Sequence, residues 1–220
     1  MNRTLKSLGF VLFLSAVLLP AGIICQPTKM DKSMMSMKPM NPQQAAFQDA
    51  MRKLWEDHIT WTRLFIVSTA AGLPDNEATT NRLLQNQVDI GNAIKPYYGG
   101  PAGDQLTALL KDHIVIAADL VKAAKANNTA AVTSANTRWI ANADQISAFL
   151  SKANPKNWPE ADMRQMMHDH LSLTTEEATE RLKGNFTADI AAYEKVHEQI
   201  LHMADMLSAG IIDQFPQKFR

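Results

Sequence analysis

Apolar residues recur at steps of three and four along the chain from Pro42 onward, which is the spacing of one face of an α-helix. Sustained two-residue alternation, the pattern of a half-buried strand, is missing from this stretch. Clusters of Gly, Pro and Asn interrupt the helical pattern at intervals, and Asp75 and Thr129 are the predicted N-caps of the helices that follow them. The pattern predicts an all-α fold with helices near 43–71, 75–95, 103–126, 129–152, 159–183 and 186–211.

The six predicted helices form three similar hairpins. The first helix of each hairpin carries the motif apolar-apolar-x-Asp-His-apolar, and the histidines of this motif are 55 and 57 residues apart. A repeat of this length indicates one helical hairpin used three times. Because three repeats are too few for a typical solenoid, we predict a compact six-helix bundle. The predicted repeats cover about 45–99, 100–154 and 159–211.

The N-terminus has the plan of a secretory signal peptide. Arg3 and Lys6 precede an apolar run over residues 8–19, and Pro20 follows it. This run is shorter than the ~20 residues of a transmembrane helix. We therefore expect residues 1–25 to be removed and the mature protein to be extracytoplasmic, either periplasmic or secreted, with a retained membrane anchor as the alternative.

Cys25 offers a second route to the membrane, because lipid is attached to a cysteine that follows such an apolar run. Gly22 and Ile24 match the usual sequence around a lipidated cysteine poorly. Membrane attachment is thus expected only through an uncleaved signal or a lipidated Cys25.

Residues 26–44 are unusually rich in methionine, with five of the chain's 12 Met interleaved with Lys, Ser and Pro. Such a composition is typical of a flexible linker. The alternative is a thioether site for Cu(I), the ion that methionine ligands select. The linker is the preferred interpretation, and the helical domain is predicted over 45–220.

Charge and cysteine content exclude several classes of protein. The 22 Lys and Arg balance the 22 Asp and Glu, so no basic face points to a nucleic acid. A single Cys excludes an intramolecular disulfide and a cysteine-based zinc finger. No P-loop or GxGxxG turn suggests a nucleotide. The sequence does not identify a protein partner.

Four segments resemble a family of small exported all-helical bacterial proteins that is uncharacterised. They are residues 54–63, 71–75, 94–99 and 141–144, and the resemblance extends over about 45–219. It implies an all-helical exported protein and transfers no catalytic residue. Some family members are labelled glycosyltransferase, but the chain has neither a nucleotide-binding βαβ pattern nor an Asp-x-Asp motif to support that label.

His58, His113 and His170 lie on the apolar stripes of their helices and are predicted to point inward. If the three hairpins surround a common axis, the imidazoles converge and form a site for a divalent metal ion, either zinc, iron or copper. Glu177, further along the third stripe, and His197, on the last helix, are the other predicted ligands.

Each motif histidine follows an aspartate, and these aspartates are predicted to orient neighbouring imidazoles as hydrogen-bond acceptors. They are Asp57, Asp112 and Asp169. The preferred interpretation is nevertheless that the histidines are structural, each buried and hydrogen-bonded to an Asp or to an amide of its own hairpin, with the metal site as the competing hypothesis. Asn86, Asn142 and Gln199 occupy equivalent positions for such an amide.

We therefore expect an exported, non-catalytic helical bundle of unknown role, with a divalent metal ion bound by the repeated histidines as its candidate chemistry. Two alternatives remain open at the level of sequence. One is a metal-dependent oxidoreductase or hydrolase that uses the same histidines. The other is a helical scaffold that binds a partner protein.

Overall fold

The computed structural model describes residues 39–220, so the predicted signal peptide (1–25) and residues 26–38 of the predicted linker lie outside it. Within this range the chain forms six α-helices and a short 3₁₀ helix, with no strand. The predicted all-α fold is confirmed. The elements are α1 (Pro42–Ala71), α2 (Asn76–Tyr98), α3 (Gly100–Lys125), α4 (Thr129–Ala153), α5 (Glu160–Leu182), α6 (Phe186–Gln214) and η2 (Pro216–Phe219).

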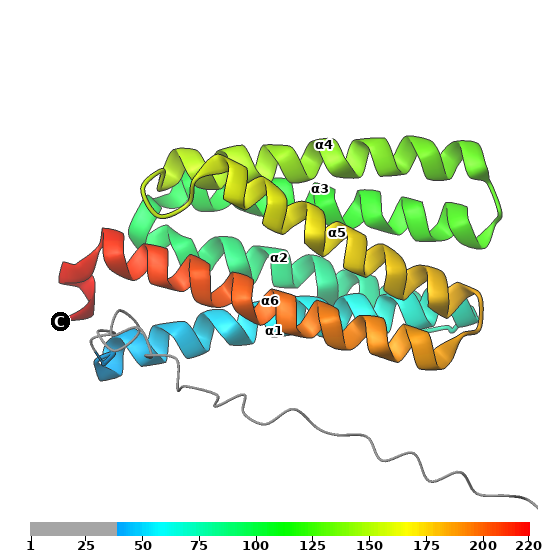
Figure 1. Cartoon of the computed structure of the whole chain (residues 1–220), viewed down its shortest axis with the longest axis horizontal. Coiled ribbons are helices and arrows are strands. Elements are labelled where there is room, and N and C mark those ends of the chain that lie inside the picture. The colour runs from blue at the N-terminus through cyan, green and yellow to red at the C-terminus, as the bar shows by residue number, and fades with distance from the viewer. Residues whose placement is uncertain (1–38) are drawn as a thin grey trace, which may run out of the picture. The chain divides into compact units, whose positions relative to one another are not determined.

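The helices lie side by side along one long axis (Figure 1). Each helix packs against the next one in the chain, and α6 closes the bundle by packing against α1. The first helices of the three hairpins, α1, α3 and α5, also contact one another across the bundle. The three helices that carry the Asp-His motif are therefore neighbours.

The N-terminus of α1 is fixed by a capping box. The Asn41 side chain accepts hydrogen bonds from the backbone N–H groups of Gln43 and Gln44, and the Gln44 side chain accepts one from the Asn41 backbone. With Pro42 as its first residue, α1 begins inside the predicted linker, just before the predicted domain boundary at residue 45.

The two predicted caps have different outcomes. Asp75 occupies the N-cap position of α2, as predicted, but its side chain makes no capping hydrogen bond and instead accepts one from the Ser68 hydroxyl. Thr129 was wrongly predicted as a cap, because the N-cap of α4 is Asn128. The side-chain oxygen of Asn128 accepts a hydrogen bond from the Ala131 backbone N–H group. Asn is as suitable an N-cap residue as Thr, because its amide oxygen can accept this bond in place of a hydroxyl.

The core is formed by one apolar face of each helix, with the large side chains of Trp158, Ile146, Met163, Ile200 and Met203 fully enclosed. A smaller cluster lies between α1, α2, α3 and α5 and includes Phe65, Leu83 and Ala178. Within residues 39–220, no helix combines the length and the apolar character needed to cross a membrane.

Two glycines allow α2 and α3 to approach each other closely. A Cβ atom on Gly91 would lie 2.6 Å from the carbonyl oxygen of Gly103, and the reverse contact is equally short. Both glycines are helical, so their role is to leave space and not to adopt an unusual backbone conformation.

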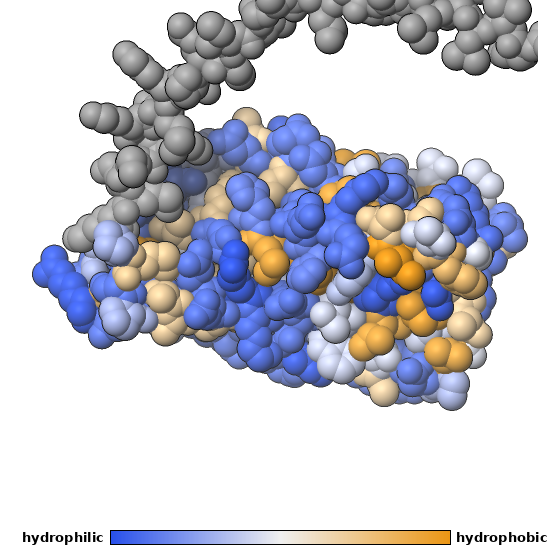
Figure 2. All heavy atoms as spheres, turned by 60° about the horizontal axis from the view of Figure 1, so that its bottom comes forward, coloured by the Kyte–Doolittle hydropathy of each residue, from blue (hydrophilic) through white to orange (hydrophobic). Residues whose placement is uncertain are grey.

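The surface is mostly polar, and Figure 2 shows this for the face that includes α1 and α6. Apolar side chains gather toward one end of that face. Exposed large apolar residues near the end of α1 and the start of α6 are Leu64, Phe186 and Ile190.

Candidate functional site

Three buried histidines form the polar centre of the bundle. His58 on α1, His113 on α3 and His170 on α5 are 4%, 3% and 5% exposed. The ring centroids of His58 and His170 are 5.8 Å apart. His113 and His170 are both close enough to affect the protonation of His58. The predicted inward direction of the three side chains is thus observed, and His58 and His170 are brought together.

Each histidine pairs with an amide side chain located 29 residues later, on the second helix of its own hairpin. His58 Nδ1 faces Gln87 Nε2 at 3.3 Å, His113 Nδ1 faces Asn142 Oδ1 at 2.7 Å, and His170 Nδ1 faces Gln199 Oε1 at 3.1 Å. The amide lies at the same position in all three hairpins, but it presents its oxygen to His113 and His170 and its nitrogen to His58.

A second hydrogen bond ties these amides to the first helix of the hairpin. Asn142 and Gln199 donate to the backbone oxygens of Leu109 and Met166, each four residues before the histidine. In the first hairpin the two tasks are divided, because Asn86 donates to the Leu54 oxygen while its neighbour Gln87 contacts the ring. The amides thus bridge the two helices at each histidine.

Both ring nitrogens of His113 are engaged. Since the Asn142 nitrogen already donates to a carbonyl, its oxygen faces His113 and accepts the Nδ1 proton. The other nitrogen, Nε2, accepts a hydrogen bond of 3.0 Å from Trp139 Nε1. The lone pair of His113 is committed to Trp139, so binding a metal ion would require that bond to break.

Burial keeps these imidazoles neutral. It lowers the pKa of His113 to about 3 and that of His170 to about 4, and it also lowers the pKa of His58. In each case the loss of hydration of the charged ring is the largest cause, followed for His58 and His113 by repulsion from neighbouring histidines.

The aspartates of the motif do not take the predicted role. Asp57 accepts a hydrogen bond from Lys53 and Asp169 accepts one from Gln165, both on the solvent side of their helices. Asp112 is exposed. Successive residues of a helix are rotated by about 100°, so an aspartate next to an inward histidine points toward the edge of the buried face. The amides on the facing helices bind the rings instead.

Glu177 lies apart from the histidines in a buried charged cluster. It is 1% exposed and accepts a hydrogen bond of 3.0 Å from Arg63, which also binds the fully buried Asp189. Arg181 contacts the same Asp189 carboxylate at 3.5 Å. Burial raises the pKa of Glu177 to about 7, because the loss of hydration raises it by more than the hydrogen bond and positive charge of Arg63 lower it.

His197 also lies away from the core histidines. Its Nε2 pairs with Glu56 at 3.0 Å on the outer surface, where α6 packs on α1. The predicted ligand set of three core histidines, Glu177 and His197 is therefore divided among three places. Over residues 39–220, no group of three or more His, Cys, Asp or Glu side chains is arranged to hold a metal ion.

The sequence interpretation missed a cleft between α5 and the α3–α4 hairpin. Figure 1 shows α5 starting beside α4 and ending beside α6. The cleft has a volume of about 380 Å³. Its apolar lining is Leu120, Val121, Ala124, Val132, Ala178 and Leu182. Its polar lining is Thr133, Asn136, Thr137, Thr175 and Thr179, and two threonine pairs spaced by four residues were the only sequence signal for it.

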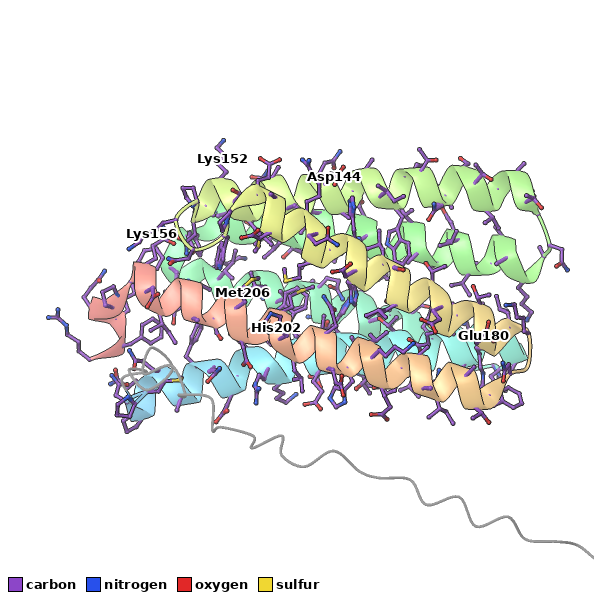
Figure 3. The ribbon with its side chains drawn as sticks, viewed as in Figure 1. Asp144, Lys152, Lys156, Glu180, His202 and Met206 are labelled. Carbon is purple, nitrogen blue, oxygen red and sulfur yellow. The ribbon has the colours of Figure 1, made fainter. Side chains whose placement is uncertain are left out.

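Surface ion pairs link α5 to α4 near its start and to α6 nearer its end. Near its start, Asp144 of α4 binds His168 at 2.9 Å and Arg164 at 3.2 Å. Nearer its end, Glu176 binds Lys195 of α6 at 3.1 Å. Figure 3 shows Asp144 beside the first part of α5 and Glu180 near the end of α5 that joins α6.

A smaller cavity of about 30 Å³ adjoins the cleft. Leu120, Val121, Thr175 and Ala178 line both spaces. The cavity also borders Trp139, the residue that binds His113. Trp139 thus lies between the smaller cavity and His113.

Comparison of the chain with protein-family models, with curated proteins and with solved structures finds no match. The side-chain geometry of residues 39–220 is therefore the basis for an assignment of function.

Proposed function

We propose that this chain is an extracytoplasmic, non-catalytic binding protein that holds a small apolar molecule in the cleft between α5 and the α3–α4 hairpin. The apolar lining of this cleft is the observation that carries the proposal. The extracytoplasmic location is supported by the signal-like N-terminus alone.

The size and lining of the cleft fit this function. Sites for small molecules are typically ~300–1,000 Å³ in volume, mainly apolar, and fitted with a few polar groups. The cleft has a volume of about 380 Å³, walls of Leu, Val and Ala, and a threonine-rich rim. None of the residues that line it is charged. An apolar molecule would therefore displace water from apolar walls at little cost in lost polar contacts.

The ion pairs of α5 favour a cleft that exists before the ligand arrives. Asp144 fixes the start of α5 to α4, whereas Glu176 fixes its later part to α6. Because the two ends are held by different neighbours, α5 cannot close onto α4 without breaking one set of contacts. A preformed site loses less conformational freedom on binding.

The arrangement of the histidines supports a non-catalytic role. Their amide partners belong to the same hairpins and bridge the paired helices, as expected of structural side chains. His113 gives both of its nitrogens to such bonds. The histidines and their amide partners thus join the two helices of each hairpin by hydrogen bonds.

Binding of a neutral fluorescent probe, N-phenyl-1-naphthylamine, tests the proposal. We expect saturable binding of one probe molecule with a rise in emission. Ala178→Phe fills the cleft and should weaken binding at least about tenfold, the equivalent of ~1.4 kcal/mol. Ala161→Phe, on the exposed part of the same helix, is the matched control and should bind normally. Absence of saturable binding, or equal binding by the Ala178 variant, would contradict the proposal.

Metal binding is the second candidate, and the proximity of His58 to His170 is the observation that favours it. Their ring centroids are 5.8 Å apart. Because His170 Nδ1 faces an amide oxygen, its Nε2 carries the lone pair that a zinc, iron or copper ion would need. His58 Nδ1 instead faces an amide N–H group, so its Nε2 proton would have to leave.

Metal analysis of the purified protein tests this candidate. A bound ion would appear in stoichiometric amount and would be lost in His170→Gln. His202→Gln, which changes an exposed histidine on α6, should retain it. Equal metal content in the two variants would rule out a site at the His58–His170 pair.

A further inference from the structure

The small cavity beside the cleft indicates which part of a ligand would go deepest. It lies among α1, α2, α3 and α5, where Phe65, Leu83 and Ile114 form part of its wall. Four of its lining residues also line the cleft. A molecule in the cleft would therefore contact side chains that also border this cavity.

The wall of the inner cavity is entirely apolar, even though three threonines contribute to it. The hydroxyls of Thr62, Thr174 and Thr175 each donate to a backbone oxygen of their own helix at 2.8–2.9 Å. No polar atom of the lining is exposed to the cavity. Apolar cavities of this kind stay dry and accept apolar groups.

The volume of the inner cavity selects the shape of the occupant. A cavity of roughly 150 Å³ is known to accept a benzene ring. The inner cavity has only about 30 Å³, which is enough for the end of an alkyl chain and too little for a ring. The lining thus favours an unbranched chain end beside Trp139.

The rim of the cleft selects the polar part of the ligand. Its side chains are hydroxyls and one amide, from Thr133, Asn136, Thr137 and Thr179. An ionised head group would find no opposite charge among the lining residues, whereas an uncharged head can hydrogen-bond to the threonine hydroxyls and the Asn136 amide. Thr133 and Thr137 donate their hydroxyl protons to their own helix, so toward a ligand they act as acceptors.

Resting on the proposed binding function, we infer that the ligand is an uncharged amphiphile with an unbranched alkyl chain and a hydrogen-bonding head such as an alcohol. The chain end occupies the inner cavity beside Trp139. The head lies at the threonine-rich rim. The cleft walls cover the middle of the chain.

Quenching by bromine locates the chain end. We expect ω-bromodecanol to quench the emission of Trp139, whereas β-bromodecanol, with bromine near the head, should quench it less. Trp139→Phe should remove the difference between the two isomers. Trp158→Phe, at a tryptophan beside Gly210 and outside both spaces, should preserve it.

Competition with the naphthylamine probe tests the head group and the inner cavity. Decanol should displace the probe more strongly than decanoate or decyltrimethylammonium. Ala117→Leu adds bulk in the inner cavity alone and should weaken decanol binding about fourfold for each methylene withdrawn, with probe binding nearly unchanged.

The outcomes separate the inference from the proposed function. If the probe does not bind at all, the cleft is not a binding site and both fail. If the probe binds but decanoate competes as well as decanol, the uncharged ligand is wrong. If both bromine positions quench alike, or Ala117→Leu leaves decanol binding unchanged, the placement of the chain end is wrong.

Discussion

The amide that faces each buried histidine determines how much that histidine contributes to stability. His113 has two partners, Asn142 and Trp139, and both are buried with it. A buried hydrogen bond contributes only about 1 kcal/mol net, but a partner left unpaired costs about 1–3 kcal/mol. Removal of His113 would therefore lower the stability mainly because the Asn142 oxygen and the Trp139 N–H group are left unpaired.

We predict that His113→Leu lowers the free energy of unfolding by about 2–4 kcal/mol, because the Asn142 oxygen and the Trp139 N–H lose their partner. Urea denaturation followed by circular dichroism measures the change. His202→Leu, on the exposed face of α6, should stay within about 0.5 kcal/mol of the parent protein. Similar effects of the two substitutions would show that the His113 bonds contribute little.

Acid should destabilise the protein. The imidazole of His113 has a pKa of about 3 in the folded protein and 6.5 without burial, and His170 follows the same direction. Below pH 6.5 the unfolded chain therefore binds more protons, and each histidine lowers stability by up to about 1.4 kcal/mol per pH unit. Glu177 has the opposite effect, because burial raises its pKa from 4.5 to about 7. Between these two pH values the folded protein binds the extra proton, so this group stabilises the fold as the pH falls.

Urea midpoints measured from pH about 7.5 down to about 4.5 check this dependence. The parent protein should lose stability steadily below pH 6.5, and His113→Leu should show a shallower slope by about one proton. A pH-independent midpoint would mean that the histidines are protonated in the folded protein at little cost.

Part of the site could be predicted from residue positions alone. The helical spacing placed His58, His113 and His170 on the inner face, and the structure buries all three. The equivalent positions of Asn142 and Gln199 also predicted two of the three ring partners, but the partner of His58 is Gln87 and not the predicted Asn86. A one-residue change of register exchanges Asn86 for Gln87, and the first hairpin uses both.

At the level of elements, sequence signals located the helices well and their paths poorly. Breaker residues gave the limits of α5 and α6 to within a few residues. The diverging course of α5 reflects its contacts first with α4 and then with α6, including the pairs Asp144–His168 and Glu176–Lys195, and contacts between helices have no periodic signature in the sequence. The only trace of the cleft in the sequence was therefore the two threonine pairs spaced by four residues, Thr133–Thr137 and Thr175–Thr179.

The closest approach of two helices supplies a test at this scale. A Cβ on Gly91 would lie 2.6 Å from the Gly103 oxygen, so Gly91→Ala should push α2 from α3 and cost about 1–3 kcal/mol. Gly100→Ala is the control, because a Cβ there has no neighbour within 4 Å. Thermal unfolding should show a clear loss only for Gly91→Ala. Equal melting temperatures would indicate that the helix pair has room to adjust.

The molecule as a whole depends on the seam where α6 closes on α1. Arg63 is the main charge across it, since it binds Glu177 and the fully buried Asp189. Arg52 crosses the same seam to Asp205, but in an exposed pair. The two arginines therefore allow a buried and an exposed ion pair to be compared within one interface.

We predict that Arg63→Met lowers the free energy of unfolding by about 3–5 kcal/mol, because it leaves two carboxylates buried with less compensation. Arg52→Met should cost less than about 1 kcal/mol, as exposed pairs usually do. Chemical denaturation of both variants measures the difference. A loss of similar size in both would show that the buried pair is not special.

The amide partners of the three core histidines are only 29 residues away in the sequence, whereas the hydrogen bonds that join the two ends of the domain span far more residues. His197 reaches back 141 residues to Glu56, and Asn41 donates across 178 residues to the Phe219 oxygen. Contacts between distant segments cost more chain entropy and form later than local ones. We therefore expect each hairpin to form its own histidine–amide contact before α6 packs on α1. The ring of helices closes last.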